Sequence, residues 1–402
     1  MRYDVDATRD RFPALADGTA FFDGPGGTQT PDVVAEAVAA TLVSGISNRG
    51  EVSAAERRAE GVVHAARDAV GDLLAVDPDG VVFGRSATAL TFLVARTLAR
   101  GWTVGDEVVV SRLDHDANVR PWVLAAEAVG ASIRFAEFDP ASGELTAADV
   151  ASVVGSRTKV VAVTAASNLI GTRPDLPAIA KVAHDAGALF YVDGVHATAH
   201  VSVDVATEGA DFWVCSPYKF LGPHHGVLAA APALLESLRP DKLVPSTDVV
   251  PERFELGTLP YELLAGTTAA IDFLATLAEE AAGSTRRERL VASFAALDEH
   301  EKRLSDRLEH GLRRIDGIRR HSNAARRTPT MLMTFDGHDV QDVRRRLADR
   351  GVNAPAGHFY AWECSHHLGL GATGGLRVGL APYTNDSDID RLLEGLAEAT
   401  RP

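Results

Sequence analysis

The chain has 402 residues, 46% of them hydrophobic, which is enough to bury a large core and suggests two domains. Its formal net charge of −15, from 40 Lys and Arg against 55 Asp and Glu, argues against a general nucleic-acid binder. No apolar run reaches the roughly 18 residues of a membrane span and the start of the chain lacks a signal-peptide pattern, so we expect no membrane association. Two cysteines do not make a disulfide framework, which favours a reducing, cytoplasmic location.

Short apolar runs alternate with helical patterns after about residue 80. Six of these runs predict buried strands, at 81–83, 107–110, 159–163, 189–192, 212–214 and 226–228. Segments between them, such as 87–99 and 175–186, carry apolar residues at three- and four-residue spacing, which is typical of helices. This alternation predicts an α/β fold whose mostly parallel sheet is covered on both faces. Ligands of such sheets bind outside the carboxyl ends of the strands.

The pattern changes after about residue 265. A long helical stretch covers 265–314, with Gly283-Ser284-Thr285 as a kink or break. A strand at 330–335, a helix at 340–348 and a strand at 376–380 follow, and they predict a smaller C-terminal α/β domain. We therefore expect an N-terminal segment, 1–20, that packs with the small domain, a large domain, 21–265, and the small domain, 266–402.

An acid and a lysine stand at the ends of two predicted strands. Asp193 ends one strand, and Lys219 lies in the loop after the next, in Ser216-Pro217-Tyr218-Lys219. This is the arrangement needed to hold pyridoxal 5'-phosphate (PLP). The lysine amine forms a Schiff base with the aldehyde of PLP, and the carboxylate keeps the ring nitrogen protonated so that the ring accepts electrons. An Asp and a Lys at this separation also occur by chance, so the prediction depends on other segments that fit the same site.

Four further segments supply suitable groups. At the strand–helix junction before Thr88, backbone N–H groups and the Thr88 hydroxyl could hold a phosphate, with an ordinary N-cap as the alternative. His115 could stack on the PLP ring, or be a surface or core histidine. Asn168 and His196 could hydrogen-bond the phenolic oxygen of PLP. Arg377, in a predicted strand, could hold a substrate carboxylate or form a structural salt bridge.

Two other patterns are rejected. Residues 369–374 formally match the dinucleotide-binding fingerprint, but they precede a strand and do not open a helix. The pairs His224-His225 and His366-His367 have no i, i+4 partner and no cysteine cluster, so we expect no metal site.

Taken together, these segments resemble the class V aminotransferase family of fold type I, and within it the cysteine desulfurase and selenocysteine lyase branch. The resemblance covers nearly the whole chain, from the Phe22-Asp23-Gly24-Pro25 region to Pro382-Tyr383. Its most specific motifs are 193–196, 216–219, 252–258 and 376–380. It implies a large domain with a mostly parallel seven-stranded sheet, and a smaller C-terminal α/β domain.

The resemblance also implies a role for each matching residue. Lys219, Asp193, His115 and Arg377 would be catalytic, with Arg377 taking the substrate α-carboxylate. The residues that would contact PLP are Ala87, Thr88, His115, Asn168, Asp193, His196, Ser216, Tyr218, Lys219 and Thr258. Thr258 would reach the phosphate of a neighbouring subunit, because family members are homodimers with shared sites. His196 replaces a frequent Gln and Tyr218 a frequent His, and both replacements keep hydrogen-bonding capacity.

One departure from the family concerns sulfur chemistry. Desulfurases carry a cysteine on a loop before the carboxylate-binding arginine, and Tyr360 occupies that position here. Tyr cannot form a persulfide. Cys364 could substitute if the loop is rearranged, or be an idle buried thiol, and Cys215 is typical of a structural residue. From their position, His358 and Tyr360 are candidates for contact with the substrate.

The leading functional prediction is a PLP enzyme that cleaves the C–S bond of cysteine or a cysteine-derived amino acid, as a β-lyase or a desulfurase. An epimerase or a class V aminotransferase would use the same residues, with Tyr360 or His358 as a second acid in epimerisation. A PLP-binding scaffold that has lost turnover is the non-enzyme alternative. The predicted partners are an amino-acid substrate and a second copy of the chain, without nucleic acid or membrane.

Overall fold

A computed structural model describes residues 3–278 and 285–401 of the chain. Its largest sheet has seven strands in the order β2-β8-β7-β6-β5-β3-β4. The strands are β2 (Val81–Gly84), β3 (Glu107–Ser111), β4 (Ser132–Ala136), β5 (Thr158–Thr164), β6 (Leu189–Asp193), β7 (Phe212–Cys215) and β8 (Gly226–Ala230). β4, β3, β5, β6 and β7 run parallel, whereas β8 is antiparallel to both β2 and β7. The predicted α/β fold with a mostly parallel seven-stranded sheet is confirmed.

The central strands are largely apolar, and both faces of the sheet there are buried against helices. Along β3, Val108 and Val110 pack into one core and Val109 into the other. The first core is completed by α4 (Ala87–Ala99), α5 (Arg120–Val129) and α9 (Pro232–Ser237). The second is completed by α3 (Ala54–Leu74), α6 (Ala147–Ala151), α7 (Leu176–Asp185), α10 (Tyr261–Leu274) and the start of α11 (Arg286–Leu312). The short α8 (Val205–Glu208) precedes β7.

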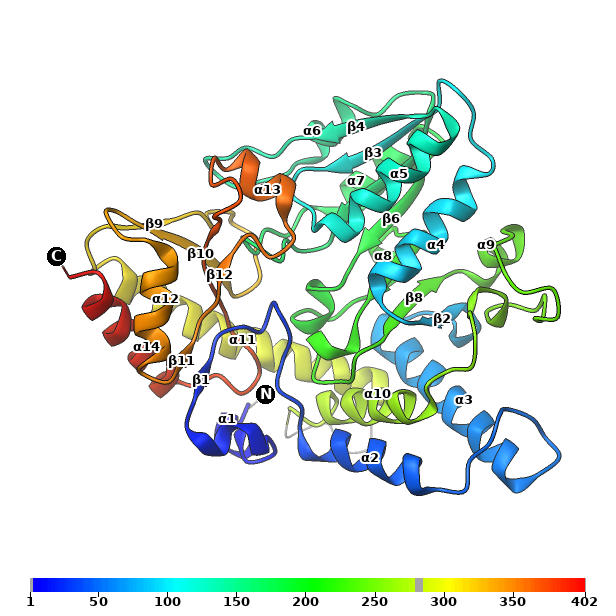
Figure 1. Cartoon of the computed structure of the whole chain (residues 1–402), viewed down its shortest axis with the longest axis horizontal. Coiled ribbons are helices and arrows are strands. Elements are labelled where there is room, and N and C mark those ends of the chain that lie inside the picture. Colours follow the sequence, from blue (N-terminus) through cyan, green and yellow to red (C-terminus); the bar gives the residue numbers. More distant parts are fainter. Residues whose placement is uncertain (1–2, 279–284, 402) are drawn as a thin grey trace.

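A four-stranded antiparallel sheet lies beside the large one (Figure 1). Its order is β12 (Ala356–Gly357), β13 (Gly375–Gly379), β10 (Thr330–Phe335) and β9 (Ile318–Arg320). This sheet shares its own core with α12 (Val340–Ala348), α14 (Asp386–Ala399) and the end of α11. The short α13 (Trp362–His367) stands between β12 and β13 in the sequence. Residues 369–374 form turns that lead into β13, so they open no helix.

Two helices occupy the stretch predicted as helical from 265 to 314. α10 begins earlier, at Tyr261 after Pro260, and ends at Leu274. α11 begins after Thr285, whose side chain accepts a hydrogen bond from the backbone N–H of Glu288 in a capping box. Of the predicted break, Gly283 and Ser284 lie outside the described residues. In Figure 1, α11 runs from beneath the large sheet to the small one.

The N-terminal segment joins the two sheets. After α1 (Val5–Arg9), the strand β1 (Ala20–Phe21) pairs in parallel with β11 (Val352–Asn353), and Asp23 continues this path beside Gly379 of β13. The Arg9 guanidinium lies 2.7 Å from the Asp388 carboxylate at the start of α14. The chain then enters α2 (Asp32–Val43), which packs on α10 and lies at the lower edge of Figure 1. The domain limits at residues 20 and 265 stay predictions.

No helix among residues 3–278 and 285–401 is long and apolar enough to cross a membrane.

Candidate active site

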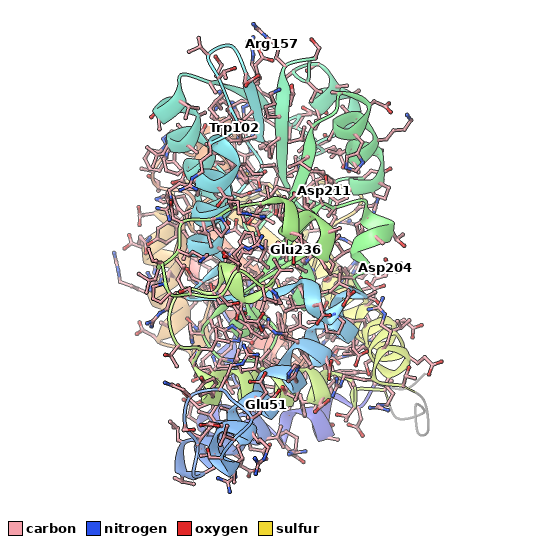
Figure 2. The ribbon with its side chains drawn as sticks, turned by 90° about the vertical axis from the view of Figure 1, so that its right-hand side faces the viewer. Glu51, Trp102, Arg157, Asp204, Asp211 and Glu236 are labelled. Atoms are coloured by element: carbon pink, nitrogen blue, oxygen red, sulfur yellow. The ribbon has the colours of Figure 1, made fainter. Side chains whose placement is uncertain are left out.

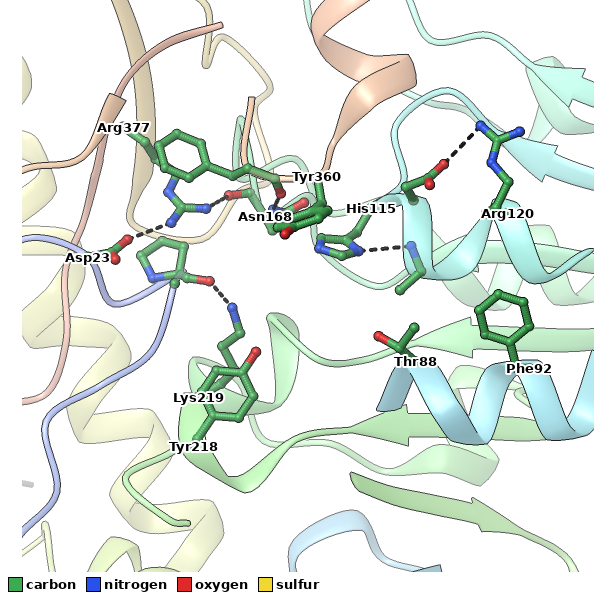
Figure 3. Close-up of a pocket in the computed structure, with 15 residues that line it drawn as sticks. Asp23, Thr88, Phe92, His115, Arg120, Asn168, Tyr218, Lys219, Tyr360 and Arg377 are labelled. Carbon is green, nitrogen blue, oxygen red and sulfur yellow. Dashed lines mark hydrogen bonds and ion pairs between the residues drawn. The ribbon is translucent and has the colours of Figure 1, made fainter. Parts of the chain in front are cut away.

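A cavity of about 560 Å³ opens where the large sheet, the small sheet and the N-terminal segment meet. A smaller recess of about 90 Å³ continues inward toward the carboxyl ends of β5, β6 and β7. The two spaces share residues that follow the carboxyl ends of β2, β3, β5 and β7, namely Thr88, His115, Ala117, Asn168, Tyr218 and Lys219. Figure 3 shows Lys219, Asp23 and Arg377 on one side of this cavity, and Phe92 and Arg120 on the other.

Lys219 lies at the centre of the site on a tight turn after β7. Its backbone N–H donates to the Ser216 carbonyl at 3.1 Å, and its Nζ donates to the Pro25 carbonyl of the N-terminal segment. The side chain is buried, and burial lowers the pKa of Lys219 to about 7, with the charge of Arg377 acting in the same direction. A large fraction of Lys219 is therefore an uncharged amine near neutral pH.

Asp193 ends β6 and lines the inner recess. One carboxylate oxygen accepts the backbone N–H of Val195 at 2.9 Å. Burial raises the pKa of Asp193 to about 6, while the Val195 N–H and the charge of Lys219 work against that rise. A cationic group in the recess would favour the charged form of this carboxylate.

The start of α4 presents backbone donors to the recess. Ser86 caps the helix, because its hydroxyl accepts the N–H of Ala89 at 3.1 Å, and Ala87 and Thr88 form the first turn. Gly226 of β8 permits this close packing, since a Cβ there would lie 2.6 Å from the backbone nitrogen of Ala87. An anion is stabilised at such a helix start by free N–H groups and by the helix dipole.

His115 caps a short turn above the cavity. Its Nδ1 accepts the backbone N–H of Ala117 at 3.0 Å, so a neutral His115 carries its proton on Nε2. Burial lowers the pKa of His115 to about 4, and the charges of Lys219 and Arg377 act in the same direction. The turn is held from below by Asp114, whose carboxylate accepts the Asn118 amide at 2.7 Å and the Ser111 hydroxyl.

Asn168 and His196 each bring an unsatisfied polar atom to the recess. His196 Nε2 lies within hydrogen-bond distance of the Thr328 and Thr330 hydroxyls, at 2.9 and 3.0 Å, and its buried Nδ1 has no partner among the described residues. Asn168 Nδ2 donates to the carbonyl of Phe359 at 3.0 Å, and its buried Oδ1 has no partner there either. Unpaired buried polar atoms are costly, so two of them on residues that line one recess favour a ligand with matching groups.

Arg377 is 1% exposed and projects from β13 toward the cavity. One Nη donates to the Asn168 carbonyl at 3.0 Å, and the other pairs with the Asp23 carboxylate at 2.6 Å. The guanidinium lies 3.7 Å from the ring centre of Phe359, and its Nε has no partner in the described part of the chain. Arg377 therefore keeps one buried donor available.

The segment before α13 forms a wall of the cavity. Phe359 and Tyr360 both have positive φ, 51° and 59°, which is uncommon for large side chains. Two contacts fix their carbonyls, because Tyr360 accepts the N–H of Asp116 at 2.7 Å while Phe359 accepts the Asn168 amide. The Tyr360 ring is exposed and lies 5.5 Å from the His115 ring.

Neither cysteine reaches the cavity surface. Cys364 in α13 and Cys215 in β7 are both 0% exposed. Burial raises the pKa of both thiols, which keeps them protonated at neutral pH. The structure therefore supports the buried alternative for Cys364 over its use in place of the missing loop thiol.

The structure brings most of the predicted site residues to these two connected spaces. The residues that line one or both are Ala87, Thr88, His115, Asn168, Asp193, His196, Ser216, Tyr218, Lys219, Tyr360 and Arg377. Two predicted residues are not among the lining residues. Thr258 is exposed, and His358 packs edge-on against Trp362 at 5.3 Å. The roles of all these residues stay predictions.

Asp23 and Phe359 were not predicted as site residues. Both contact Arg377 directly. The only sequence signal for Asp23 was its place in the glycine-rich 22–28 motif, and for Phe359 its place beside Tyr360.

The sequence matches the aminotransferase class-V family over residues 20–392. It is 36% identical over 400 residues to an uncharacterized protein of Mycobacterium tuberculosis, with 99% of each chain covered. It is 32% identical over 406 residues to a probable cysteine desulfurase of Pseudomonas aeruginosa, with 96% of each covered.

Solved structures of cysteine desulfurases have the same fold as this chain. The crystal structure of a cysteine desulfurase from Escherichia coli superposes with a TM-score of 0.86 at 26% identity, covering 99% of both chains. A cysteine desulfurase from Thermococcus onnurineus superposes with a TM-score of 0.87 at 23% identity, covering 100% of this chain and 98% of that one.

Proposed function

Because the chain belongs to the aminotransferase class V family, we propose that it is a PLP-dependent enzyme that cleaves the C–S bond of cysteine or a cysteine-derived amino acid. The observation that carries the proposal is a pair of adjoining cavities that Lys219 lines throughout, with Arg377 in the outer one and Asp193 in the inner one. These three groups are the amine, the acid and the carboxylate receptor that amino-acid chemistry on PLP requires.

The residues present fit this cofactor. The start of α4 would receive the phosphate, and Asp193 would hold the ring nitrogen in its protonated form. Asn168 and His196 would approach the phenolic oxygen, Asn168 donating from its amide nitrogen and His196 from Nδ1 when that atom carries the proton. When bound, PLP supplies an electron-accepting ring that stabilises the negative charge left at Cα after proton removal.

Side chains of the protein would bind the substrate and transfer its protons. Arg377 would orient the α-carboxylate, and Phe359 above it excludes water from that contact. Lys219, with a pKa of about 7, would remove the α-proton at neutral pH. His115, neutral and fixed by Ala117, would cover the opposite side of the site and offer its Nε2–H. Tyr360 beside it bounds the space for the substrate side chain.

The fate of the sulfur separates a lyase from a desulfurase that uses a loop thiol. Tyr360 replaces that thiol, and both cysteines of the chain are buried. We therefore favour β-elimination, in which the α-proton and the β-sulfur substituent leave, and the remaining fragment reacts with water. The products would be a thiol or sulfide, pyruvate and ammonia.

We also propose that the enzyme is a homodimer whose subunits share active sites. Apolar side chains stand exposed in two segments of one face, Leu42, Val43 and Val52 in the first and Leu243, Val244, Val249 and Leu256 in the second. Arg49 joins these segments, because its guanidinium lies 3.1 Å from the Glu252 carboxylate. Figure 2 shows Glu51 of the first segment and Glu236 beside the second on the same face. Thr258, at the end of the second segment, would reach the partner's site. A cytoplasmic location stays a prediction from composition.

The reaction is tested by incubating the PLP-loaded protein with cysteine, S-substituted cysteines and cysteine sulfinate. Pyruvate and the matching thiol in equal amounts would support the lyase. Alanine with sulfide or sulfite would instead support a desulfurase type. Absence of every product would remove this substrate class.

The cofactor assignment needs its own control. Borohydride treatment should fix PLP to the peptide that contains Lys219 in the native protein, and to no peptide in Lys219→Ala. Lys181, which is exposed and pairs with Asp185, provides a matched control substitution, since Lys181→Ala should leave the labelling of Lys219 unchanged.

A further inference from the structure

Asp23 places a carboxylate in the same cavity as Arg377 and Lys219. Its side chain is 34% exposed, whereas that of Arg377 is 2% exposed, so the acid stands on the cavity side of this ion pair. Figure 3 shows the Asp23–Arg377 pair on the same side of the cavity as Lys219, whose Nζ donates to the Pro25 carbonyl.

Glycines on either side fix the position of this carboxylate. A Cβ at Gly26 would lie 2.4 Å from both carboxylate oxygens of Asp23, so only glycine lets the acid fold over that residue. A Cβ at Gly24 would lie 2.5 Å from the Leu380 carbonyl, which keeps the backbone against β13. The Asp23 backbone pairs with Gly379 in the same region. The backbone that carries Asp23 is thus held against β13, and the glycine at 26 leaves room for its carboxylate.

The pair places opposite charges in one cavity, as the recognition of a zwitterionic α-amino acid requires. Arg377 retains an unpaired Nε donor beyond the contacts it makes to Asp23 and Asn168. Asp23 and Lys219 line the same cavity, so the acid and the reacting amine face one shared space. In the free protein each charge of the pair satisfies the other.

We propose that Asp23 receives the α-ammonium of the incoming substrate while Arg377 receives its α-carboxylate. The site would then select zwitterionic α-amino acids over simple carboxylic acids. This inference rests on the proposed function, because it describes how the substrate is held before reaction at Lys219. Asp23 is accordingly a substrate-positioning residue.

The alternative is that Asp23 only neutralises a buried arginine, since an unpaired buried charge is strongly unfavourable. The two roles differ in what the site loses when the acid is removed. If Asp23 is only a counter-ion, its removal changes the affinity for every ligand with a carboxylate to the same extent. A receptor for the ammonium acts only on ligands that carry both charges.

The test measures dissociation constants by calorimetry for L-alanine and for propionate, with the PLP-loaded native protein and with Asp23→Asn. We expect Asp23→Asn to weaken L-alanine about tenfold or more, the worth of one hydrogen bond between charged groups, and to leave propionate unchanged or tighter. Equal weakening of both ligands, or no change in either, would overturn the inference.

Two further variants keep the test decisive. Gly26→Ala would displace the Asp23 carboxylate without removing its charge. It should therefore weaken L-alanine selectively, as Asp23→Asn does. This variant serves if Asp23→Asn does not fold. Asp116→Asn is the matched control, because Asp116 lines the same cavity but pairs with Arg120 on the opposite side. It should leave the ratio of the two dissociation constants unchanged.

The PLP spectrum separates failure of the inference from failure of the proposed function. If native protein binds L-alanine without any change in the PLP spectrum, the proposed function fails. If the spectrum changes but the ratio of the two dissociation constants does not respond to Asp23→Asn, only the present inference fails.

Discussion

The chemistry of this site depends on the pKa of the buried Lys219 amine. Burial and Arg377 lower the pKa of Lys219 to about 7, against an ordinary value of 10.5. We predict that the rate at which PLP-free protein captures PLP rises with pH through about 7 and is level above it, because only the uncharged amine attacks an aldehyde. Stopped-flow absorbance measures this rate. A midpoint near 10 would contradict the prediction.

The same lysine affects stability. Between about pH 7 and the unfolded value near 10.5, the unfolded chain binds more protons at Lys219 than the folded chain does. The contribution of Lys219 to the free energy of unfolding therefore becomes more favourable as pH rises through this window. Replacing Lys219 by Met should flatten that dependence in PLP-free protein, as measured by urea unfolding at several pH values.

The cysteines provide a third prediction at the scale of single residues. Cys364 and Cys215 are 0% exposed, and burial raises the pKa of both thiols. Iodoacetamide should therefore leave both unlabelled in the native protein and label both after unfolding in denaturant, as read by mass spectrometry. Rapid labelling of native Cys364 would restore it as a candidate sulfur acceptor.

At the scale of elements, the wall formed by Phe359 and Tyr360 includes the position where the sequence resemblance predicts the loop thiol of desulfurases. The Tyr360 side chain is 71% exposed at the cavity, while its carbonyl is fixed by the N–H of Asp116 at 2.7 Å. We predict that Tyr360→Cys gains one sulfur atom at residue 360 after incubation with L-cysteine and PLP, because the new thiol faces the substrate. Mass spectrometry of the tryptic peptide measures the gain.

The matched control is Tyr360→Ser, because serine is close to cysteine in size but has no thiol. It should show no gain in mass. No gain in Tyr360→Cys either would mean that the anchored wall holds residue 360 out of reach of the substrate sulfur.

The sequence predicted those elements that carry a regular apolar pattern. The large sheet could be predicted because its central strands are apolar on both faces. Lys219, Asp193 and His115 could be predicted because Asp193 ends such a strand and the other two follow one. The strand β4 was missed because Ser132, Ile133 and Arg134 alternate at a half-exposed edge. The turn before α13 was not predicted, since positive φ at Phe359 and Tyr360 depends on contacts with distant residues.

Asp23 shows why part of the site could not be predicted. Its place beside Arg377 follows from the pairing of β1 with β11, which joins opposite ends of the chain. No local pattern encodes such a pairing. The glycines at 24 and 26 were visible in the sequence, but the groups that they must accommodate are known only from the fold.

At the scale of the whole molecule, the exposed apolar face predicts the oligomeric state. Val43 is 87% exposed and Val244 is 96% exposed, in the two segments that Arg49 and Glu252 join. If a second copy covers them, burying each side chain contributes roughly 1.5–3 kcal/mol. The double substitution Val43→Asp with Val244→Asp should therefore raise the dissociation constant of the dimer by about a hundredfold or more.

Sedimentation equilibrium measures that constant, and Val104→Asp is the matched control, because Val104 is 84% exposed but lies outside the two segments. If Thr258 reaches the partner's site, the monomer should also bind PLP more weakly, whereas a dimer held by another face would leave both measurements unchanged. A loss of PLP affinity that disappears at high protein concentration would connect the two effects, since mass action restores the dimer and with it the shared site.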